Sequence, residues 1–399
     1  MKVLVADKLP PSGLQALARA GYEVVEDAAV KDQALIDKLV ETQAEVLIVR
    51  STKVPRAALQ AGSLGLVVRA GAGYNNVDVD AAAEMGIYVA NCPGKNAVAV
   101  AELTMGLLLA LDRQIPDCVQ SLRQGRWNKK GFSQARGLLG RTLGVIGLGE
   151  IGRQVVARAR AFGMPVIAWS RSLTEEAAEE LGVRRAADPL QVARESDAVS
   201  VHVALTGDTR GMIDEAFFAA MRPGAFFLNT SRGEVVDGAA LQAAITAKGL
   251  RAGLDVWNKQ PADATGDFAD PLGAMPQVYG THHIGASTDQ AQDAVAAEAV
   301  RVARCYKERG EVPNCVNLQV ASPAAGTLVV RHLDRVGVLA FVLEQLKTAS
   351  INVQEMSNVH FAGAEGAACA TIHVDTVPDA AVLTTLRGDE RILAIRVTT

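Results

Sequence analysis

LGVIGLGEIG, residues 143–152, joins a short apolar run to the pattern G-x-G-x-x-G. Residues 143–146 have the composition of a buried strand, and a helical pattern follows over Arg153–Phe162. The first glycine of the pattern permits a tight turn, the second lets backbone approach a ligand, and the third lets the helix pack on the strand. Free N–H groups at the helix N-terminus favour an anion. We therefore expect a dinucleotide pyrophosphate site formed by Gly147, Leu148, Gly149, Glu150, Ile151 and Gly152.

Strands and helices alternate on both sides of this stretch, which predicts two parallel α/β units. Because the glycine pattern begins only at residue 147, the first unit is not expected to bind the dinucleotide. Two long apolar helical patterns, Ala97–Leu111 and Asp289–Arg309, are expected to cross between the units. Besides residues 143–146, the expected strands are Lys2–Asp7, Tyr22–Val25, Val46–Val49, Leu66–Val68, Ile87–Ala90, Val166–Trp169, Ala198–Val203, Phe226–Asn229, Gly253–Val256 and Val278–Tyr279.

The C-terminal part has a different pattern. Residues 321–326 (ASPAAG) have the composition of a linker, and strand, helix, strand, strand, helix and strand patterns follow in a ferredoxin-like order. The predicted organisation is a substrate domain over 1–97 and 284–318, a Rossmann domain over 98–283, a linker over 319–326 and a small α+β domain over 327–399. Hinges are expected near Ala97 and Ile284, where the chain changes domain.

Composition excludes several classes of protein. The chain has 399 residues, which suits two or three domains, and its formal net charge of −4 offers no basic surface for nucleic acid or an anionic membrane. No apolar run reaches the length of a bilayer span and no signal peptide is recognisable, so we expect a cytoplasmic protein. Five scattered cysteines indicate reduced thiols, and no metal-ligand spacing is present.

Segments that follow predicted strands carry side chains suited to anion binding and proton transfer. Arg232, in the sequence NTSRG, can bind a carboxylate with two parallel hydrogen bonds. A histidine in THHIGAST can donate a proton near neutral pH. Because successive residues of an extended chain point opposite ways, only one of His282 and His283 is expected to enter the site. Gln260 could hydrogen-bond that imidazole.

Two further features have competing interpretations. The turn over residues 69–78 (RAGAGYNNVD) lacks the third glycine of the fingerprint. The N–H groups of Ala72 and Gly73 could bind a carboxylate there, and an ordinary strand-to-helix turn explains the same residues equally well. His202 lies inside a predicted strand and is expected to be a packed core residue.

The segments at 69–78, 91–96, 147–152, 229–233 and 283–288 together resemble, in order and spacing, the D-isomer-specific 2-hydroxyacid dehydrogenases. The likeness covers essentially the whole chain and is strongest to the phosphoglycerate dehydrogenase branch with a C-terminal ACT domain. It implies a Rossmann domain inserted in a flavodoxin-like α/β substrate domain, followed by a ferredoxin-like regulatory ACT domain. The implied reaction is NAD(P)-dependent interconversion of D-3-phosphoglycerate and 3-phosphohydroxypyruvate, the first step of serine biosynthesis. Glyoxylate or hydroxypyruvate reductase is the main alternative, and formate dehydrogenase or a nucleotide-sensing corepressor is a more distant one.

The resemblance also implies residue roles. His283, which precedes Ile-Gly-Ala-Ser-Thr, corresponds to the acid/base, Arg232 to the carboxylate-binding arginine, and Gln260 to the partner of the histidine. It further implies substrate contacts from Arg50, Ser51, Arg69, Ala72, Gly73 and Asn96, cofactor contacts from Ser170, Arg171 and Asp255, and an amino-acid effector site with His332, Asp334 and Asn352. Assembly as a homodimer or homotetramer is the expectation for this branch.

Three positions depart from the family pattern. Gln260 stands where the family usually has Glu, and a neutral amide can orient an imidazole but cannot stabilise its charge, so we expect reduction to fall off at lower pH. Ser170 replaces the acid that binds the ribose of NAD, and Arg171 could pair with a 2′-phosphate, so NAD and NADP stay open. Asp334 replaces an Asn and would repel an effector's carboxylate, so the module could serve sensing or assembly.

Overall fold

The structure is a computed structural model that describes residues 1–261, 265–319, 324–362 and 366–398. The chain divides into two compact units, Met1–Asn317 and Leu318–Thr399, each of which is described by itself. The part of the expected linker over residues 320–323 lies outside the described residues. None of the helices in the described ranges combines the length and apolar character needed to cross a membrane.

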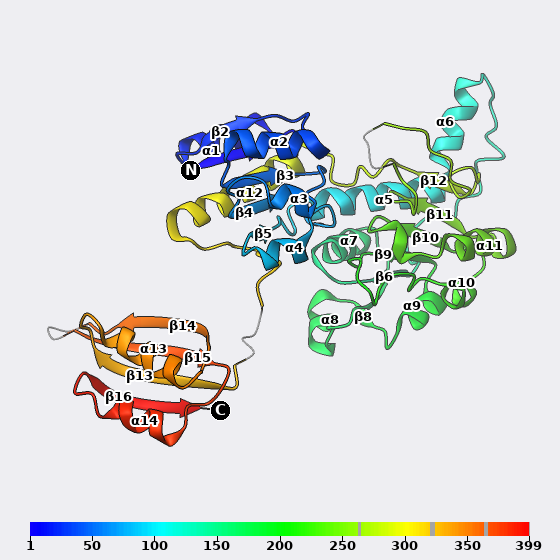
Figure 1. Ribbon diagram of the computed structural model, residues 1–399. Coiled ribbons are helices and arrows are strands. Elements are labelled where there is room, and N and C mark those ends of the chain that lie inside the picture. The colour runs from blue at the N-terminus through cyan, green and yellow to red at the C-terminus, as the bar shows by residue number, and fades with distance from the viewer. Residues whose placement is uncertain (262–264, 320–323, 363–365, 399) are drawn as a thin grey trace. The chain divides into compact units, whose positions relative to one another are not determined.

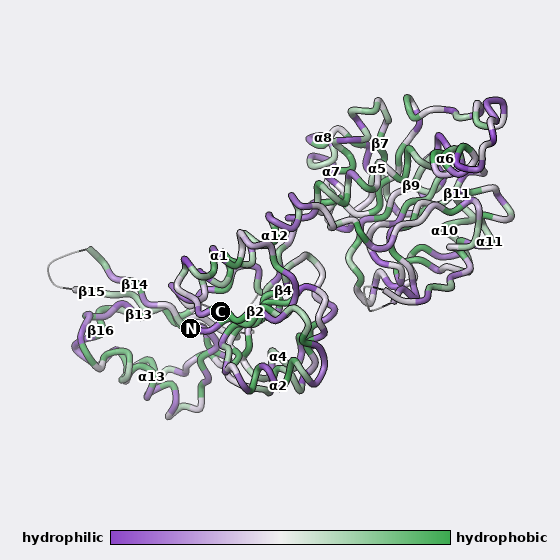
Figure 2. Tube along the Cα trace, turned by 90° about the horizontal axis from the view of Figure 1, so that it is seen from above, coloured by the Kyte–Doolittle hydropathy of each residue, from purple (hydrophilic) through white to green (hydrophobic). Residues whose placement is uncertain are grey.

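The first sheet of the first unit is parallel and has the strand order β2-β1-β3-β4-β5 (Figure 1). Its central strands are short apolar runs whose residues are almost all buried, as expected for a parallel sheet covered on both faces. Apolar and polar residues interleave along the covering helices, which therefore turn one face inward (Figure 2). The elements are β1 (Lys2–Val5), α1 (Pro11–Arg19), β2 (Glu23–Glu26), α2 (Asp32–Thr42), β3 (Val46–Val49), α3 (Arg56–Leu59), β4 (Leu66–Arg69), α4 (Val79–Glu84) and β5 (Tyr88–Ala90).

Two long helices connect the two sheets of this unit. Helix α5 (Ala97–Arg113) contacts strands of the second sheet, and helix α12 (Asp289–Arg309) returns and packs against α1. The chain after α12 then runs beside β5, where Ala90 and Cys315 form an antiparallel bridge. Asn317 closes this return by accepting a hydrogen bond from the backbone N of Val89 at 2.9 Å.

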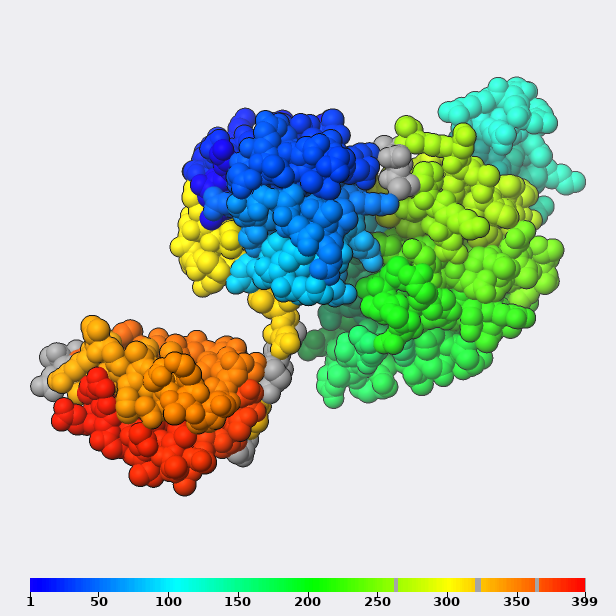
Figure 3. Space-filling view, viewed as in Figure 1, coloured from blue at the N-terminus to red at the C-terminus, as the bar shows by residue number. Residues whose placement is uncertain are grey.

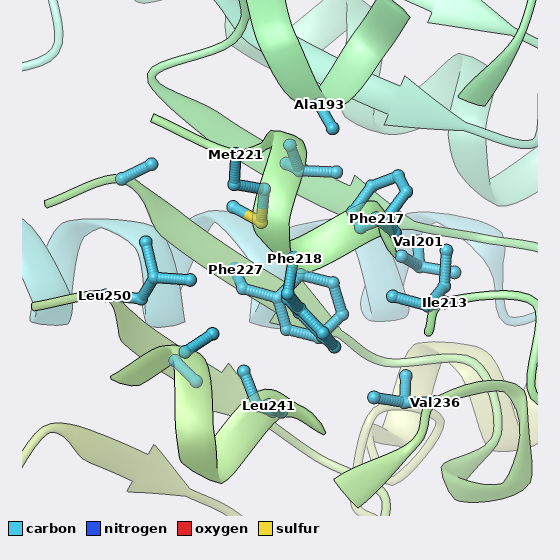
Figure 4. Close-up of a cluster of buried hydrophobic side chains, with 14 of the residues drawn as sticks. Ala193, Val201, Ile213, Phe217, Phe218, Met221, Phe227, Val236, Leu241 and Leu250 are labelled. Carbon is cyan, nitrogen blue, oxygen red and sulfur yellow. The ribbon is translucent and has the colours of Figure 1, made fainter. Parts of the chain in front are cut away.

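The second sheet is also parallel, with the order β12-β11-β10-β9-β6-β7-β8. Six of these strands reproduce the doubly wound nucleotide-binding order, with β6 at the point where the order reverses. Phe217, Phe218 and Phe227 form the centre of the core on one face (Figure 4). The remaining elements are α6 (Ile115–Arg123), β6 (Leu143–Ile146), α7 (Glu150–Ala161), β7 (Val166–Trp169), α8 (Glu175–Leu181), β8 (Arg184–Arg185), α9 (Pro189–Glu195), β9 (Ala198–Val201), α10 (Glu215–Ala220), β10 (Phe226–Asn229), a 3₁₀ turn (Gly233–Val235), α11 (Gly238–Lys248), β11 (Arg251–Leu254) and β12 (Val278–Gly280).

Helix α6 and the segment after it lie at the surface of the first unit (Figure 3). None of the nine residues of α6 is buried, and Trp127 just beyond it is 81% exposed. The helix is anchored at its base, where the hydroxyl of Tyr279 donates to a carboxylate oxygen of Asp117 at 2.5 Å.

The second unit is a four-stranded antiparallel sheet with the order β14-β15-β13-β16 and two helices. Alternate residues of β13 are buried against the helices, which gives the unit a core of its own. The Rossmann-type α/β fold with parallel sheets is therefore confirmed, and a separate antiparallel C-terminal domain is present. Its elements are β13 (Gly326–Leu333), α13 (Val338–Thr348), β14 (Val353–His360), β15 (Ala367–Val374), α14 (Ala380–Arg387) and β16 (Ile392–Thr398).

Candidate active site

The turn between β6 and α7 has the shape that its glycines predict. Gly147 has φ +95°, and a Cβ atom there would lie 2.5 Å from the carbonyl oxygen of His202. A Cβ atom at Gly152 would lie 2.1 Å from the carbonyl oxygen of Gly147. By contrast, a Cβ atom at Gly149 would meet nothing within 4 Å, so open space adjoins the uncapped N-terminus of α7. The loop therefore fits a pyrophosphate.

The other residues expected to bind the cofactor lie either in the glycine turn itself or directly after β7. Leu148 and Ile151 pack into the hydrophobic core of the second sheet, while the side chain of Glu150 lies against Gly94. Ser170 and Arg171 directly follow β7, where the ribose of a dinucleotide lies in this fold. Arg171 Nη1 lies 3.5 Å from Asp208 Oδ2, and both side chains are more than 80% exposed.

A cleft of about 610 Å³ brings most of the expected substrate residues together. Side chains from the carboxyl ends of several strands meet there, as expected for parallel sheets. Among the expected residues, the cleft is lined by Arg50, Ser51, Arg69, Gly73, Asn96, Arg232, Gln260 and His283. Ala72 does not line it, and its carbonyl oxygen instead accepts a hydrogen bond from Asn91 Nδ2 at 2.6 Å.

Three arginines in the cleft have no acidic partner among the described residues. Burial, followed by the charges of Arg232 and Arg50, lowers the pKa of Arg69 to about 10. Burial likewise lowers the pKa of Arg232. Arg69 Nε is buried without a hydrogen-bond partner, and both guanidinium groups lie against the 69–78 turn, where Cβ atoms at Gly71 and Gly73 would clash with them. Like charges held together without an ion-pair partner among the described residues indicate a site for an anion.

His283 is positioned by two unusual local features. Its φ of +54° places it in the left-handed region, which few residues other than glycine adopt. Its Nδ1 lies 2.7 Å from Gln260 Nε2, while Gln260 Oε1 accepts from the backbone N of Trp257 at 3.3 Å. Loss of hydration, then the charge of Arg232, lowers the pKa of the imidazole, and Asp255 opposes that change.

Comparison with known proteins agrees with this geometry. Residues 105–285 match the family model described as the NAD binding domain of D-isomer specific 2-hydroxyacid dehydrogenases. A hydroxypyruvate reductase of Thermotoga maritima is 40% identical over 313 residues, which cover 77% of this chain and 98% of that protein. The chain belongs to the D-isomer specific 2-hydroxyacid dehydrogenase family. This membership includes an NAD(P)-binding Rossmann domain.

Two further relatives are both named as phosphoglycerate dehydrogenases. D-3-phosphoglycerate dehydrogenase of Methanocaldococcus jannaschii is 40% identical over 325 residues, 80% of this chain, but these cover only 60% of its own length. The chain thus spans less than two thirds of that relative. The NAD⁺-bound 3-phosphoglycerate dehydrogenase structure of Entamoeba histolytica aligns with a TM-score of 0.67 and 25% identity, covering 80% of this chain and 99% of that one.

One expectation about the residues near His283 requires correction. Both His282 and His283 line the cleft, because the chain is not extended there and the left-handed His283 breaks the alternation of side chains. Asp255 is only 1% exposed, and both of its carboxylate oxygens accept hydrogen bonds from residues 281–285, on either side of His283. As expected, His202 is packed, with burial lowering its pKa to about 3.

The three effector residues expected in the second unit do not come together within it. His332 is 2% exposed, and its ring nitrogens contact the carbonyl oxygen of Leu333 and Asn358 Oδ1 at 2.7 and 3.1 Å. Asp334 instead approaches His360, with 3.1 Å between Oδ2 and Nδ1. Because of the antiparallel register, Asn352 lies at the opposite end of the sheet from His332.

Sequence reasoning also missed several residues of the cleft. Lys8 lies three residues after the end of β1, and Asn75 lies six residues after the end of β4. A search of the segments that follow the strands could therefore have found both. Gln292 lies in the first turns of α12 and contacts Arg50 Nη1 through its Oε1 at 3.3 Å. Glu234 and Arg210 line an adjoining cavity of about 400 Å³ together with His283. No pattern in the sequence marks these last three.

Proposed function

We propose that this chain interconverts D-3-phosphoglycerate and 3-phosphohydroxypyruvate with an NAD(P) cofactor, the first step of serine biosynthesis. The observation that carries the proposal is the convergence of Arg50, Arg69 and Arg232 on one cleft without acidic partners among the described residues. A cleft with this charge favours a substrate that is anionic at both ends. D-3-phosphoglycerate dehydrogenases of several organisms, 37–40% identical to this chain, support the same choice.

Each polar group of the cleft has a role in this proposal. Arg232, with the adjacent N–H of Gly73, binds the carboxylate of the substrate, and Arg50 and Arg69 bind its phosphate. His283 protonates the carbonyl oxygen during reduction and accepts the hydroxyl proton during oxidation. The bound nicotinamide supplies or accepts the hydride at C2. Gln260 holds the imidazole through Nδ1, which leaves Nε2 for the substrate.

The test measures nicotinamide absorbance with 3-phosphoglycerate, 3-phosphohydroxypyruvate, hydroxypyruvate, glyoxylate and formate in parallel. The highest kcat/KM is expected with the phosphorylated pair. The near-complete coverage of the Thermotoga hydroxypyruvate reductase favours one alternative, a reductase of unphosphorylated 2-keto acids. A higher kcat/KM for hydroxypyruvate or glyoxylate than for 3-phosphohydroxypyruvate would establish that alternative and reject the proposal.

The cofactor preference is a separate proposal. We propose that NADP is accepted at least as well as NAD, because Ser170 offers no carboxylate to bind the ribose and Arg171 is exposed beside it. The ratio of kcat/KM for the two cofactors measures this preference. Arg171→Ser should lower kcat/KM for NADP much more than for NAD, and equal losses with both cofactors would contradict the assignment.

The second unit is proposed to be an ACT-type domain that serves mainly in assembly. Two observations support this role: His332 is enclosed, and Asn352 is separated from Asp334 within one copy. Residues 1–97 with 284–318, and residues 98–283, are proposed to close on the substrate as two bodies hinged near Ala97 and Ile284. Heat released by serine or a related amino acid in calorimetry would contradict a role limited to assembly. A monomer in light scattering would contradict assembly as a homodimer or homotetramer.

A further inference from the structure

The turn between β1 and α1 lines the cleft, and Asp7 in this turn holds a second segment of the cleft wall. Asp7 Oδ2 accepts hydrogen bonds from the backbone N atoms of Arg50, Ser51 and Thr52 at 2.7, 3.0 and 2.9 Å. Asp7 Oδ1 accepts from Ser51 Oγ at 2.9 Å. Three successive N–H groups that converge on one oxygen form a nest for an anion. The carboxylate therefore fixes the backbone of two residues that line the cleft, Arg50 and Ser51.

Asp7 keeps its charge but cancels little of the positive charge of the cleft. Burial raises the pKa of its carboxyl, but the hydrogen bonds from Arg50, Thr52 and Ser51 outweigh burial and lower the pKa below its ordinary value. At the guanidinium of Arg69, the like charges of Arg232 and Arg50 act more strongly than the opposite charge of Asp7. The cleft thus remains cationic around this carboxylate.

Lys8, the next residue of the turn, adds a fourth cation to the cleft. It lines the cleft together with Arg50, Arg69 and Arg232, and its ammonium has no ion pair or hydrogen bond among the described residues. Its backbone is held from both sides, because Asp7 is bonded to residues 50–52 and Leu9 is buried. Lys8 is therefore held at the cleft wall while its ammonium is free to bind an anion.

The turn is also connected to the start of α12. Ser12 Oγ donates to Asp293 Oδ1 at 3.1 Å, and Arg50 Nη1 donates to Gln292 Oε1 at 3.3 Å. Arg50 is thus positioned twice, at its backbone by Asp7 and at its guanidinium by Gln292. Fixed guanidinium groups together with a compact ammonium suit the several oxygens of a phosphate.

We infer that the β1–α1 turn is part of the phosphate site: Lys8 binds an oxygen of the substrate phosphate, and Asp7 is a positioning residue that holds Arg50 and Ser51 for the same group. The inference rests on the proposed function, because it concerns how a phosphorylated substrate is distinguished from an unphosphorylated one. A phosphate monoester carries about two negative charges near neutral pH, so a single arginine does not neutralise it.

Lys8→Gln is the main test, because Lys8 is exposed and its replacement leaves the core untouched. 3-Phosphohydroxypyruvate and hydroxypyruvate differ only in the phosphate, so the ratio of their KM values isolates contacts with that group. The ratio should rise about tenfold in Lys8→Gln, because one charged hydrogen bond to the substrate is lost. Lys53→Gln is the matched control, since Lys53 is also exposed but does not line the cleft, and it should leave the ratio unchanged.

Asp7→Asn tests the positioning role, because it keeps the size of the side chain and removes the charge that holds residues 50–52. The same KM ratio should rise on the order of tenfold, as Arg50 and Ser51 lose their fixed position. Asp27→Asn is the control: Asp27 also follows a strand directly, but it accepts only from the backbone N of Ala29, at 3.3 Å. Equal increases in KM for both substrates in Asp7→Asn would show a merely structural role and overturn the positioning role.

Calorimetry with inorganic phosphate tests the site without turnover. Phosphate should bind about tenfold more weakly to Lys8→Gln than to the wild type or to Lys53→Gln. If the wild type reduces hydroxypyruvate or glyoxylate but turns over no phosphorylated acid, the proposed function fails, and this titration alone decides the inference. The inference is overturned if Lys8→Gln leaves the KM ratio unchanged. Where no phosphorylated acid is turned over, it is overturned if phosphate does not bind the wild type or binds Lys8→Gln equally well.

Discussion

Gln260 is the direct side-chain partner of His283. Its amide nitrogen lies 2.7 Å from Nδ1, where a carboxylate would form a charge-assisted hydrogen bond with an imidazolium. The pKa of His283 is already lowered by loss of hydration and by Arg232. Since the lowered pKa disfavours the protonated donor, reduction should decline as pH rises through a value below the ordinary histidine pKa of about 6.5. Oxidation should rise through the same value.

Gln260→Glu should reverse this shift. A carboxylate beside Nδ1 stabilises the imidazolium, so the pH at which reduction reaches half its maximum should move upward by about one unit or more. The measurement is the pH dependence of kcat in both directions. Lys259→Gln, a change of charge at the neighbouring exposed position, should leave the profile in place. An unchanged profile in Gln260→Glu contradicts the role given to this residue.

Arg69 provides a second prediction at the scale of one residue. Because its guanidinium is buried without an acidic partner, an anionic substrate group should supply the missing charge. Arg69→Gln should raise KM for 3-phosphohydroxypyruvate by about 100-fold, because the substrate loses the binding free energy of one charged hydrogen-bonded pair. KM for glyoxylate should change little. Equal increases in KM for both substrates would place Arg69 at the shared carboxylate and not at the phosphate.

How far single residues can be predicted depends on whether their signal is local. The family pattern and the strand ends identified Arg232, Gln260 and His283, and the structure brings all three to one cleft. The sequence could not reveal the left-handed conformation of His283, since nothing in its neighbours requires it. The residues around it are hydrogen-bonded to Asp255, 28 positions earlier in the numbering, through contacts that exist only after β11 and β12 pair.

At the scale of elements, a single added methyl group in the β6–α7 turn should abolish cofactor binding and destabilise the fold. Gly147→Ala combines a left-handed φ with a contact of 2.5 Å to the carbonyl oxygen of His202. The expected result is loss of measurable cofactor binding and destabilisation by about 2 kcal/mol or more. Gly249→Ala is the control, because its φ is also positive but a Cβ atom there meets nothing within 4 Å. Thermal unfolding and cofactor titration distinguish the two variants.

Helix α12 is tied to the rest of the first unit by Glu298. Its carboxylate accepts from Arg301 Nη2 at 2.6 Å and from Asn314 Nδ2 at 2.7 Å, and Lys95 lies 3.5 Å away. These partners, chiefly Arg301, lower the pKa of Glu298 from 4.5 to about 2. The depressed pKa means that the stabilisation is complete above pH 4.5 and is lost as pH falls from there toward 2.

Glu298→Gln should therefore reduce the free energy of unfolding by about 2 kcal/mol at pH 7. The difference between variant and wild type should shrink below pH 4.5, where the carboxylate of the unfolded chain is protonated. Urea unfolding at several pH values measures it. Glu311→Gln, which removes only an exposed pair with Arg309, is the control and should change little. If the difference in the free energy of unfolding between variant and wild type stays constant down to pH 3, protonation of Glu298 is not coupled to stability.

The helices and strands that could be predicted from the sequence are those with long or regular runs of apolar residues. Strands β3, β7 and β10 begin and end where their apolar runs do, because burial specifies them. Helix α12 begins and ends with its periodic run, between the caps Thr288 and Gly310. The short helices α3, α8, α9 and α10 have at most seven residues, too few for a periodic signal, and depend on caps and packing. Helix α6 has no buried residue, so a periodic pattern of buried residues could not predict it.

At the scale of the whole molecule, the described part of the cleft is formed by residues of the first unit alone. Every described residue that lines it lies between Lys8 and Val295, within Met1–Asn317. The hydrophobic core of the second unit contains only residues from Leu328 onward. Separate cores mean that the two units fold by separate sets of contacts, so removing one need not unfold the other.

A chain ending at Val320 tests this independence. Asn317 stays in place and keeps its hydrogen bonds to Ile87 and Val89, so the return segment beside β5 remains held. With the cleft intact, kcat/KM per folded chain should stay within about threefold of the full chain, since surface truncation away from a site costs little. If the second unit serves assembly, the shortened chain should form a smaller particle in light scattering. A folded, shortened chain that has lost turnover would instead show that the second unit shapes the active site.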